Sequence, residues 1–210
     1  MTRIIKIWLV AFYVFFSELV FSQDQEVILI RHAKVNIEVS GWMGPKKAAQ
    51  LRKLYDTSPI YPFVPGSVLE KLPELKTDTV YVSSLCRSVS TGWMLFGDSA
   101  IILSSPFFDE FDLHIVRLPF ILPYKGWTGI SRALWLLGAN QKHNESHREA
   151  KRRVKQIADF IELRLQYNKQ VILVTHGFLN RNVARELKKR NWQQVADNGG
   201  KNLGTTLLRK

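Results

Sequence analysis

Cysteine is nearly absent from this sequence, which has only one in 210 residues. Cys86 therefore cannot form a disulfide within the chain, and we expect it to be a buried structural thiol rather than a reactive group. A domain of this length does not need a disulfide for stability. The single cysteine is therefore compatible with export from the cytoplasm.

Long apolar runs are also scarce, since only residues 7–16 form an unbroken run of ten. This run is too short to span a bilayer comfortably, which takes about 20 residues. It follows a basic start with Arg3 and Lys6 and precedes a more polar exit, which is the layout of a secretory signal peptide. Residues 1–22 are predicted to be a cleaved signal peptide or else an uncleaved anchor, in which Glu18 would cost roughly 3 kcal/mol in lipid. We therefore expect export to the bacterial periplasm, or attachment to the inner membrane by this segment.

The chain also has no internal repeat, no low-complexity segment and no His/Cys/Asp cluster with the spacing of metal ligands. Its composition, 46% hydrophobic and 23% charged, is that of one globular domain with an ample core. We place that domain at residues 23–210.

Charge is in excess, with a net value of +12 and a pI near 9.9. A basic protein can bind nucleic acid, an anionic membrane surface or a small anionic substrate. Much of the excess lies in residues 148–155 and 181–190, which also have the pattern of amphipathic helices, so solvated helix faces are the simpler interpretation. No aromatic residues interleave with these runs as a single-strand binding groove would require, so no nucleic acid is expected as a partner.

Two apolar runs, at residues 27–30 (VILI) and 171–174 (VILV), are typical of strands buried on both faces of a parallel sheet. Further short strands are predicted at 79–83 and 101–103. Predicted helices alternate with the strands, at residues 45–55, 87–96, 146–167 and 178–190, and a last strand follows at 204–208. This order favours a three-layer α/β/α sandwich with a mainly parallel sheet.

Two segments interrupt the alternation. Residues 58–73 contain four prolines and are predicted to be an irregular surface segment. Residues 107–143 combine acids, prolines and aromatics, with a possible helix at 127–137. We expect this second segment to form a small cap over the carboxyl edge of the sheet.

Histidines follow both buried runs. Arg31 and His32 follow the first, and His176 and Gly177 follow the second. The carboxyl ends of parallel strands meet at one edge of the sheet, where ligands bind in open α/β folds. Arg87, at the start of the helix after the second strand, would reach the same edge. The sequence therefore predicts a phosphate-handling site built from arginines and two histidines.

Four motifs, RHAK, VSSLCRS, FFDEFDL and VTHG, resemble those of the histidine phosphatase superfamily, also called phosphoglycerate mutase-like. The resemblance extends from Val27 to the end of the chain, with the motifs in the expected order. A GW pair, a helix ending in LYD and the W, LW, G and ES pattern from Trp127 to Ser146 are similar to small bacterial members of this superfamily.

The resemblance implies a role for each motif residue. His32 would be the nucleophile that becomes phosphohistidine, with Arg31 and Arg87 binding the phosphoryl group. A protonated His176 would donate another hydrogen bond to that group. Glu110 matches best the acid that protonates the leaving group.

Asp109 and Asp112 flank Glu110, and the sequence leaves open which of the three acids is the proton donor. Neither a metal nor a cofactor is expected. The predicted function is metal-independent hydrolysis of phosphomonoesters, acting on a small phosphorylated substrate or on a phosphohistidine protein.

Two alternatives remain. One is a phosphotransferase of the phosphoglycerate mutase type, and the other is a catalytically silent basic module that binds surfaces. The sequence leaves the natural substrate and the oligomeric state open, and membrane contact is expected only through the N-terminal segment.

Overall fold

The protein is described by a computed structural model that covers residues 25–140, 145–198 and 200–210. The signal peptide or anchor predicted at residues 1–22 lies outside the described residues. Within those residues, no helix combines the length and the apolar character needed to cross a bilayer.

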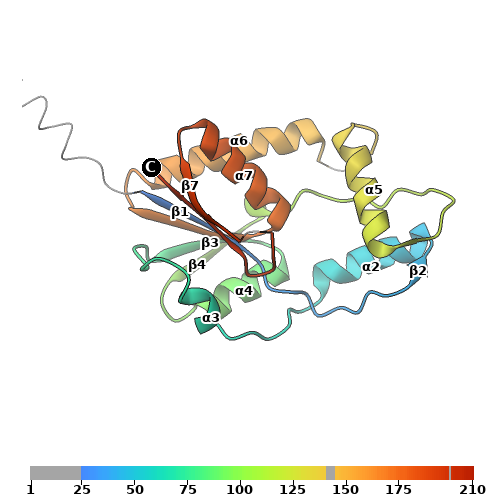
Figure 1. Ribbon diagram of the computed structural model, residues 1–210, viewed down its shortest axis with the longest axis horizontal. Helices are drawn as coiled ribbons and strands as arrows, with labels where there is room; N and C mark the ends of the chain where they lie inside the picture. Colours follow the sequence, from blue (N-terminus) through green and yellow to red (C-terminus); the bar gives the residue numbers. More distant parts are fainter. Residues whose placement is uncertain (1–24, 141–144, 199) are drawn as a thin grey trace, which may run out of the picture.

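A six-stranded sheet forms the centre of the fold, in the order β4-β3-β6-β1-β8-β7 (Figure 1). Four neighbouring strands are parallel: β4 (Ile101–Ser105), β3 (Thr79–Ser83), β6 (Gln170–Thr175) and β1 (Glu26–Arg31). The next strand, β8 (Thr205–Arg209), runs antiparallel to β1, and the edge strand β7 (Gln193–Asp197) runs antiparallel to β8. The predicted α/β sandwich with a mainly parallel sheet is confirmed.

Both faces of the central strands are buried, because side chains alternate between the faces of a strand. In β1, Val27 and Leu29 belong to one apolar cluster, while Ile28 and Ile30 belong to another on the opposite face. Pairing with β6 in register, Val27 with Val171, adds the same alternation from the neighbouring strand. This two-sided burial explains why the runs are continuously apolar.

Helices cover the two faces of the sheet (Figure 1). One face packs against α6 (His147–Arg164) and α7 (Gly177–Lys189), and the other against α4 (Cys86–Phe96) and the short α3 (Gly66–Leu69). The predicted capping box starts α6, since the Ser146 side chain accepts from the Glu149 amide and the Glu149 carboxylate accepts from the Ser146 amide. In α4, a Cβ at Gly92 would lie 2.7 Å from Val82 Cγ1, so this glycine lets the helix pack closely on β3.

The cap stands over the carboxyl end of the parallel strands. It comprises the 3₁₀ turn η1 (Pro106–Phe108), an irregular stretch, β5 (Leu122–Pro123) and α5 (Tyr124–Leu136). It packs against α2 (Pro45–Thr57), and β5 pairs with β2 (Trp42–Met43). The buried Trp127 donates from Nε1 to the Met43 carbonyl over 2.7 Å, which ties these two segments together.

Three local expectations need correction. Residues 58–73 are not wholly irregular, because they contain α3, whose Val68 is buried in the core. The edge strand β7 was not predicted, since its QQVAD sequence is mostly exposed and lacks an apolar face. Cys86 is exposed rather than buried, because it begins α4 on the side away from the sheet, while Arg87 and Ser88 turn inward.

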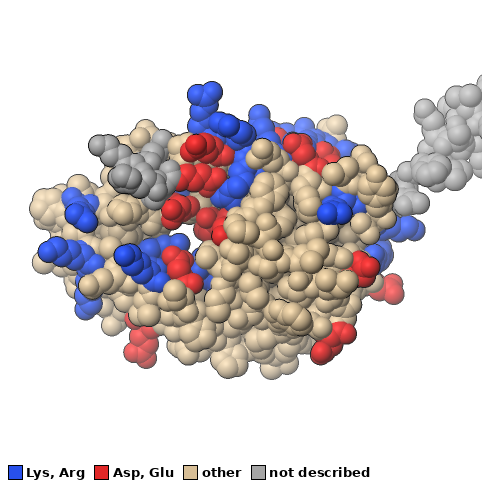
Figure 2. All heavy atoms as spheres, turned by 180° about the vertical axis from the view of Figure 1, so that it is seen from behind, with Lys and Arg blue, Asp and Glu red and all other residues tan. Residues whose placement is uncertain are grey.

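Charged residues of both signs are mixed on one face of the molecule. On the face seen in Figure 2, lysines and arginines stand beside acidic residues rather than in one continuous basic patch. Arg190, for example, forms ion pairs with Asp159 at 2.6 Å and with Glu162 at 2.9 Å. This arrangement agrees with the interpretation of the basic runs as solvated helix faces.

Candidate active site

A pocket of about 380 Å³ lies where the parallel strands end beneath the cap. The predicted site residues Arg31, His32, Arg87, Glu110 and His176 all line it. The other lining residues come mainly from α2, the cap and the start of α7: Arg52, Tyr55, Leu113, Tyr124, Thr128, Arg132, Gly177, Phe178, Arg181 and Gly200. The structure thus brings together residues that are far apart in the sequence.

His32 is buried directly after β1, and its backbone amide donates to the Thr175 carbonyl at the end of β6. Its ring Nδ1 lies 2.7 Å from the Ala33 carbonyl. A carbonyl only accepts hydrogen bonds, so Nδ1 carries the proton of the neutral ring and Nε2 carries the lone pair. His32 is therefore oriented with a nucleophilic nitrogen available.

The surroundings of His32 disfavour its charged form. Burial, together with the charges of Arg87 and Arg31, lowers its pKa from 6.5 to about 3, although the hydrogen bond to Ala33 acts in the opposite direction. A lowered pKa means that the ring stays neutral, and thus nucleophilic, as the pH falls through the range where an ordinary histidine is protonated.

We predict that the His32 ring of the unliganded protein is neutral at pH 5, because its pKa lies near 3. Long-range ¹H–¹⁵N spectra of histidine-labelled protein, recorded between pH 7 and pH 5, distinguish neutral from charged rings. Free histidine in the same buffer serves as the reference. A His32 resonance that titrates near the ordinary value of about 6.5 contradicts this description of the site.

His176 lies beside His32, with 5.1 Å between the ring centroids. Its Nε2 is 2.7 Å from the Ser83 hydroxyl, which itself donates to Asp109 at 2.7 Å. Because the Ser83 proton is used on Asp109, His176 Nε2 must be the donor to Ser83. Burial lowers the pKa of His176 and keeps the ring neutral, so it is the tautomer that carries its proton on Nε2. Its Nδ1 is buried and has no hydrogen-bond partner among the described residues.

The protonated His176 expected from the sequence is not what the unliganded site favours. Burial lowers its pKa well below 6.5, and the charge of Arg87 adds to the effect. A bound phosphate dianion would act in the opposite direction, because a nearby negative charge favours the imidazolium. Protonation of His176 would then accompany substrate binding rather than precede it.

Arg87 is buried, with 1% of its surface exposed, at the start of α4. Its Nη1 donates to Asp56 on α2 over 2.9 Å, and Asp56 also pairs with Arg52 at 3.1 Å. The Arg87 Nε is buried and has no partner among the described residues. A buried guanidinium with an unused donor in a pocket is suited to binding an oxyanion.

Arg31 leaves β1 at the same edge. Its Nη1 donates to the Gly200 carbonyl over 2.7 Å, while its buried Nε has no partner among the described residues. A Cβ at Gly177 would lie 3.0 Å from Arg31 Cδ. Gly177 therefore leaves room for the Arg31 side chain beside the first turn of α7.

Asp56 is a positioning residue, because it holds the Arg87 side chain in place. No role was predicted for Asp56 from the sequence, although it is the last residue of the LYD motif. We predict that Asp56→Asn lowers the free energy of unfolding by about 1.5 kcal/mol, the lower end for a hydrogen bond to a charged group. The lower end applies because the Asp56 side chain is 31% exposed.

Urea unfolding of Asp56→Asn measures this effect. Saturating inorganic phosphate should reduce the difference in the free energy of unfolding between the variant and the parent protein, because the anion becomes a new partner for Arg87. Asp78→Asn is the matched control, since Asp78 is exposed and its carboxylate accepts from the hydroxyl of the adjacent Thr79. Equal stability of the two variants would show that Asp56 does not support Arg87.

Glu110 is held at the amino end of α7. Its carboxylate accepts from the amides of Phe178 at 3.2 Å and Leu179 at 3.1 Å, and from the Phe111 amide at 3.0 Å. Burial nevertheless raises its pKa, against these hydrogen bonds and the charge of Arg132. A raised pKa keeps a larger fraction of the carboxyl protonated near neutral pH, as a general acid requires.

The two flanking acids lie elsewhere. Asp109 does not line the pocket, and its carboxylate accepts from Ser83 and from the amide and hydroxyl of Ser84. Asp112 is exposed and accepts from the Leu113 amide. Of the three acids left open by the sequence, only Glu110 lines the pocket.

The cap and α2 contribute pocket residues that sequence reasoning did not find. Arg52 and Tyr55 come from α2, and Tyr124 and Arg132 come from α5. Tyr55 is the middle residue of the LYD motif, and Arg52 and Arg132 lie in predicted helices. Tyr124 had no signal beyond the aromatic character of the cap segment. Lys34 is not among the lining residues, and its Nζ lies over the Tyr61 ring at 4.9 Å.

A metal centre does not emerge from the geometry, since the described residues contain no group of three or more His, Cys, Asp or Glu side chains placed to hold an ion.

Comparison with known proteins finds similarity at the level of structure. No family model matches the sequence, and no curated protein matches it. Among solved structures, phosphoglycerate mutase from Bacillus anthracis matches with a TM-score of 0.59 and 14% identity, covering 90% of this chain and 89% of that one.

Two phosphatases match similarly. Phosphoserine phosphatase from Entamoeba histolytica, in complex with 3-phosphoglyceric acid, gives a TM-score of 0.54 at 16% identity and covers 87% of this chain and 89% of its own. Mycobacterial glucosyl-3-phosphoglycerate phosphatase gives 0.54 at 18% identity and covers 87% and 92%. All three proteins are phosphatases or mutases of the histidine phosphatase superfamily, whose fold this chain shares.

Proposed function

We propose that this chain, which has the fold of the histidine phosphatase superfamily, hydrolyses phosphomonoesters through a phosphohistidine on His32. The single observation that carries the proposal is the free Nε2 lone pair of the neutral His32 ring, set in a pocket with Arg31 and Arg87. Phosphatases and mutases among the structural neighbours support phosphoryl transfer in general, without indicating a substrate.

In the first step, His32 Nε2 attacks phosphorus, so an N–P bond forms while the bond to the ester oxygen breaks. Arg31 and Arg87 hold the phosphoryl oxygens and balance the charge that develops on them. Protonated Glu110 gives its proton to the departing alkoxide.

The second step reverses these roles. The Glu110 carboxylate left by the first step removes a proton from water, which attacks phosphorus. The N–P bond then breaks, and neutral His32, protonated Glu110 and inorganic phosphate are restored. Each residue therefore returns to its starting state without an added reagent, which fits a hydrolase that needs no cofactor.

Hydrolysis of p-nitrophenyl phosphate and of a panel of alkyl phosphates at mildly acidic pH tests this function. Arg87→Gln should lose most of the activity, whereas Lys34→Gln, which removes a cation outside the pocket, should keep it. No phosphate release from any ester by the purified domain would instead favour the silent surface-binding module.

The product balance distinguishes hydrolysis from phosphotransfer. A hydrolase given a single phosphate ester in water releases inorganic phosphate in equal amount to the alcohol. A phosphotransferase of the mutase type releases less phosphate than alcohol and forms a new phosphate ester. We expect the first result.

We also propose that the protein is exported, either freed by cleavage after residue 22 or held at the inner membrane by residues 1–22. The basic start and the apolar run at residues 7–16 support this proposal. Cell fractionation followed by N-terminal sequencing tests it, and full-length chain in the cytoplasmic fraction would exclude both versions.

A further inference from the structure

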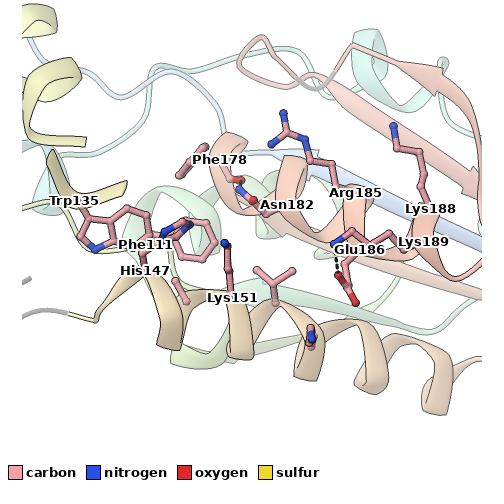
Figure 3. Close-up of a pocket in the computed structure, with 13 residues that line it drawn as sticks. Phe111, Trp135, His147, Lys151, Phe178, Asn182, Arg185, Glu186, Lys188 and Lys189 are labelled. Carbon is pink, nitrogen blue, oxygen red and sulfur yellow. Dashed lines mark hydrogen bonds and ion pairs between the residues drawn. The ribbon is translucent and has the colours of Figure 1, made fainter. Parts of the chain in front are cut away.

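A second pocket, of about 350 Å³, lies between α6 and α7 (Figure 3). It shares Phe178 with the candidate active site, but none of His32, Arg87 or His176 lines it. The phosphatase proposal therefore does not require this second pocket or predict what it binds.

Four rings form one continuous aromatic wall on this pocket: His147, Trp135, Phe111 and Phe178. Trp135 lies 5.1 Å from the His147 ring and stacks on Phe111 at 5.8 Å, with an interplanar angle of 23°. Phe111 in turn meets Phe178 edge to face at 5.4 Å. Ala150 and Val154 of α6 also line the pocket but are themselves buried. Phe111 and Trp135 are almost fully buried, with 2% and 1% of their surface exposed, so the partly exposed His147 and Phe178 rings form the part of the wall that a ligand can reach. These two rings can pack against a flat apolar group.

Cations line the same pocket. Lys151, which points from α6 towards α7 in Figure 3, Lys155 and Arg185 have no carboxylate within ion-pair distance in the described part of the chain. Glu186 is the one acid among the described residues that line the pocket, and it is paired with Lys189 at 3.1 Å and with Arg190 at 3.6 Å. The pocket therefore carries uncompensated positive charge next to an apolar surface.

We propose that this pocket binds a small amphipathic anion, with a flat apolar body on the aromatic wall and a carboxylate, sulfonate or phosphate head near Lys151. The volume is within the range of sites for small organic ligands. A neutral hydrophobe would leave the lysines without a partner, and a small inorganic anion would leave the exposed surface of the His147 and Phe178 rings uncovered. Both features are satisfied together only by a ligand that has both parts.

Fluorescence titration with 8-anilinonaphthalene-1-sulfonate tests the proposal on the folded protein. We expect saturable binding of one dye per chain, in the parent protein and equally in His32→Ala. Lys151→Glu should weaken binding about tenfold or more, because it places a like charge beside the sulfonate. The control Lys169→Glu makes the same change in net charge at an exposed position outside the pocket and should stay within about twofold.

Two competitors locate the dye. Orthovanadate, which should occupy the candidate active site, is expected not to displace it, and the neutral analogue N-phenyl-1-naphthylamine should bind much more weakly. Displacement by vanadate, or equal binding of the neutral analogue, overturns the proposal. Because His32→Ala is expected to bind the dye, failure of the phosphatase mechanism and failure of this site are distinguishable.

A second copy of the chain is the competing occupant. Sedimentation velocity of the parent protein and of Lys151→Glu tests it. A dimer that dissociates in the variant and excludes the dye would show that the groove is an interface between copies, and the small-anion proposal would then be wrong. A protein that is monomeric at the concentrations of the titration supports the small-anion proposal.

Discussion

His32→Ala is expected to reduce turnover of every phosphomonoester by on the order of 10⁴-fold or more, the scale of loss when a covalent nucleophile is removed. The reason is that no other described group in the pocket has the same position and an oriented lone pair. The measurement is steady-state release of inorganic phosphate, with circular dichroism to confirm that the variant is folded.

The matched control is His114→Ala, which removes an exposed histidine of the cap. It should retain activity close to that of the parent protein. Comparable losses in the two variants would mean that the assay reports folding rather than the nucleophile. Full activity of His32→Ala would require the phosphohistidine mechanism to be abandoned.

Glu110→Gln is expected to slow formation of phosphohistidine from alkyl phosphates by about 10² to 10⁴-fold, the contribution of general acid catalysis. An alkoxide is strongly basic and needs the proton, whereas p-nitrophenolate is stable enough to leave nearly unaided. The same variant should therefore form phosphohistidine from p-nitrophenyl phosphate at nearly the parent rate. Single-turnover kinetics with the two kinds of ester measure this difference.

The pH dependence of this step follows from the raised pKa of Glu110. Because the acid form is active, the rate with alkyl phosphates should fall as the pH rises through that pKa. Glu110→Gln has no titrating acid at this position, so this decrease should be absent from its profile.

Asp109→Asn and Asp112→Asn are the controls for the identity of the acid. Asp109 accepts from the serine that contacts His176, so its replacement should affect both kinds of ester alike. Asp112 is exposed, and its replacement should have little effect. If the leaving-group dependence appears in either of these variants instead of Glu110→Gln, the assignment of the proton donor is wrong, while the nucleophile stands.

Much of the sheet could be predicted because its strands carry strong patterns. A strand covered on both faces needs apolar residues at every position, so the runs in β1 and β6 could be identified directly. Their ends then placed His32 and His176 at one edge, because parallel strands share a direction. The edge strand β7 has no such pattern, since water covers most of its side chains.

The support around the site could not be predicted from local patterns. Asp56 lies 31 positions from Arg87, and nothing in either segment indicates that α2 would bring the two together. The tautomer of His176 depends on Ser83 and Asp109, which come from two other parts of the chain. Such contacts depend on how the elements pack, whereas the residue types at the strand ends can be identified in the sequence itself.

Trapping of the phosphoenzyme tests the central claim most directly. In Glu110→Gln the base that activates water is missing, so phosphohistidine formed from p-nitrophenyl phosphate should accumulate. Rapid quenching at neutral to alkaline pH, followed by peptide mass spectrometry, is predicted to find one phosphoryl group per chain on His32, together with an equal burst of p-nitrophenolate. Turnover without a burst and without phosphate on His32, or a phosphoryl group on another residue, would contradict the account.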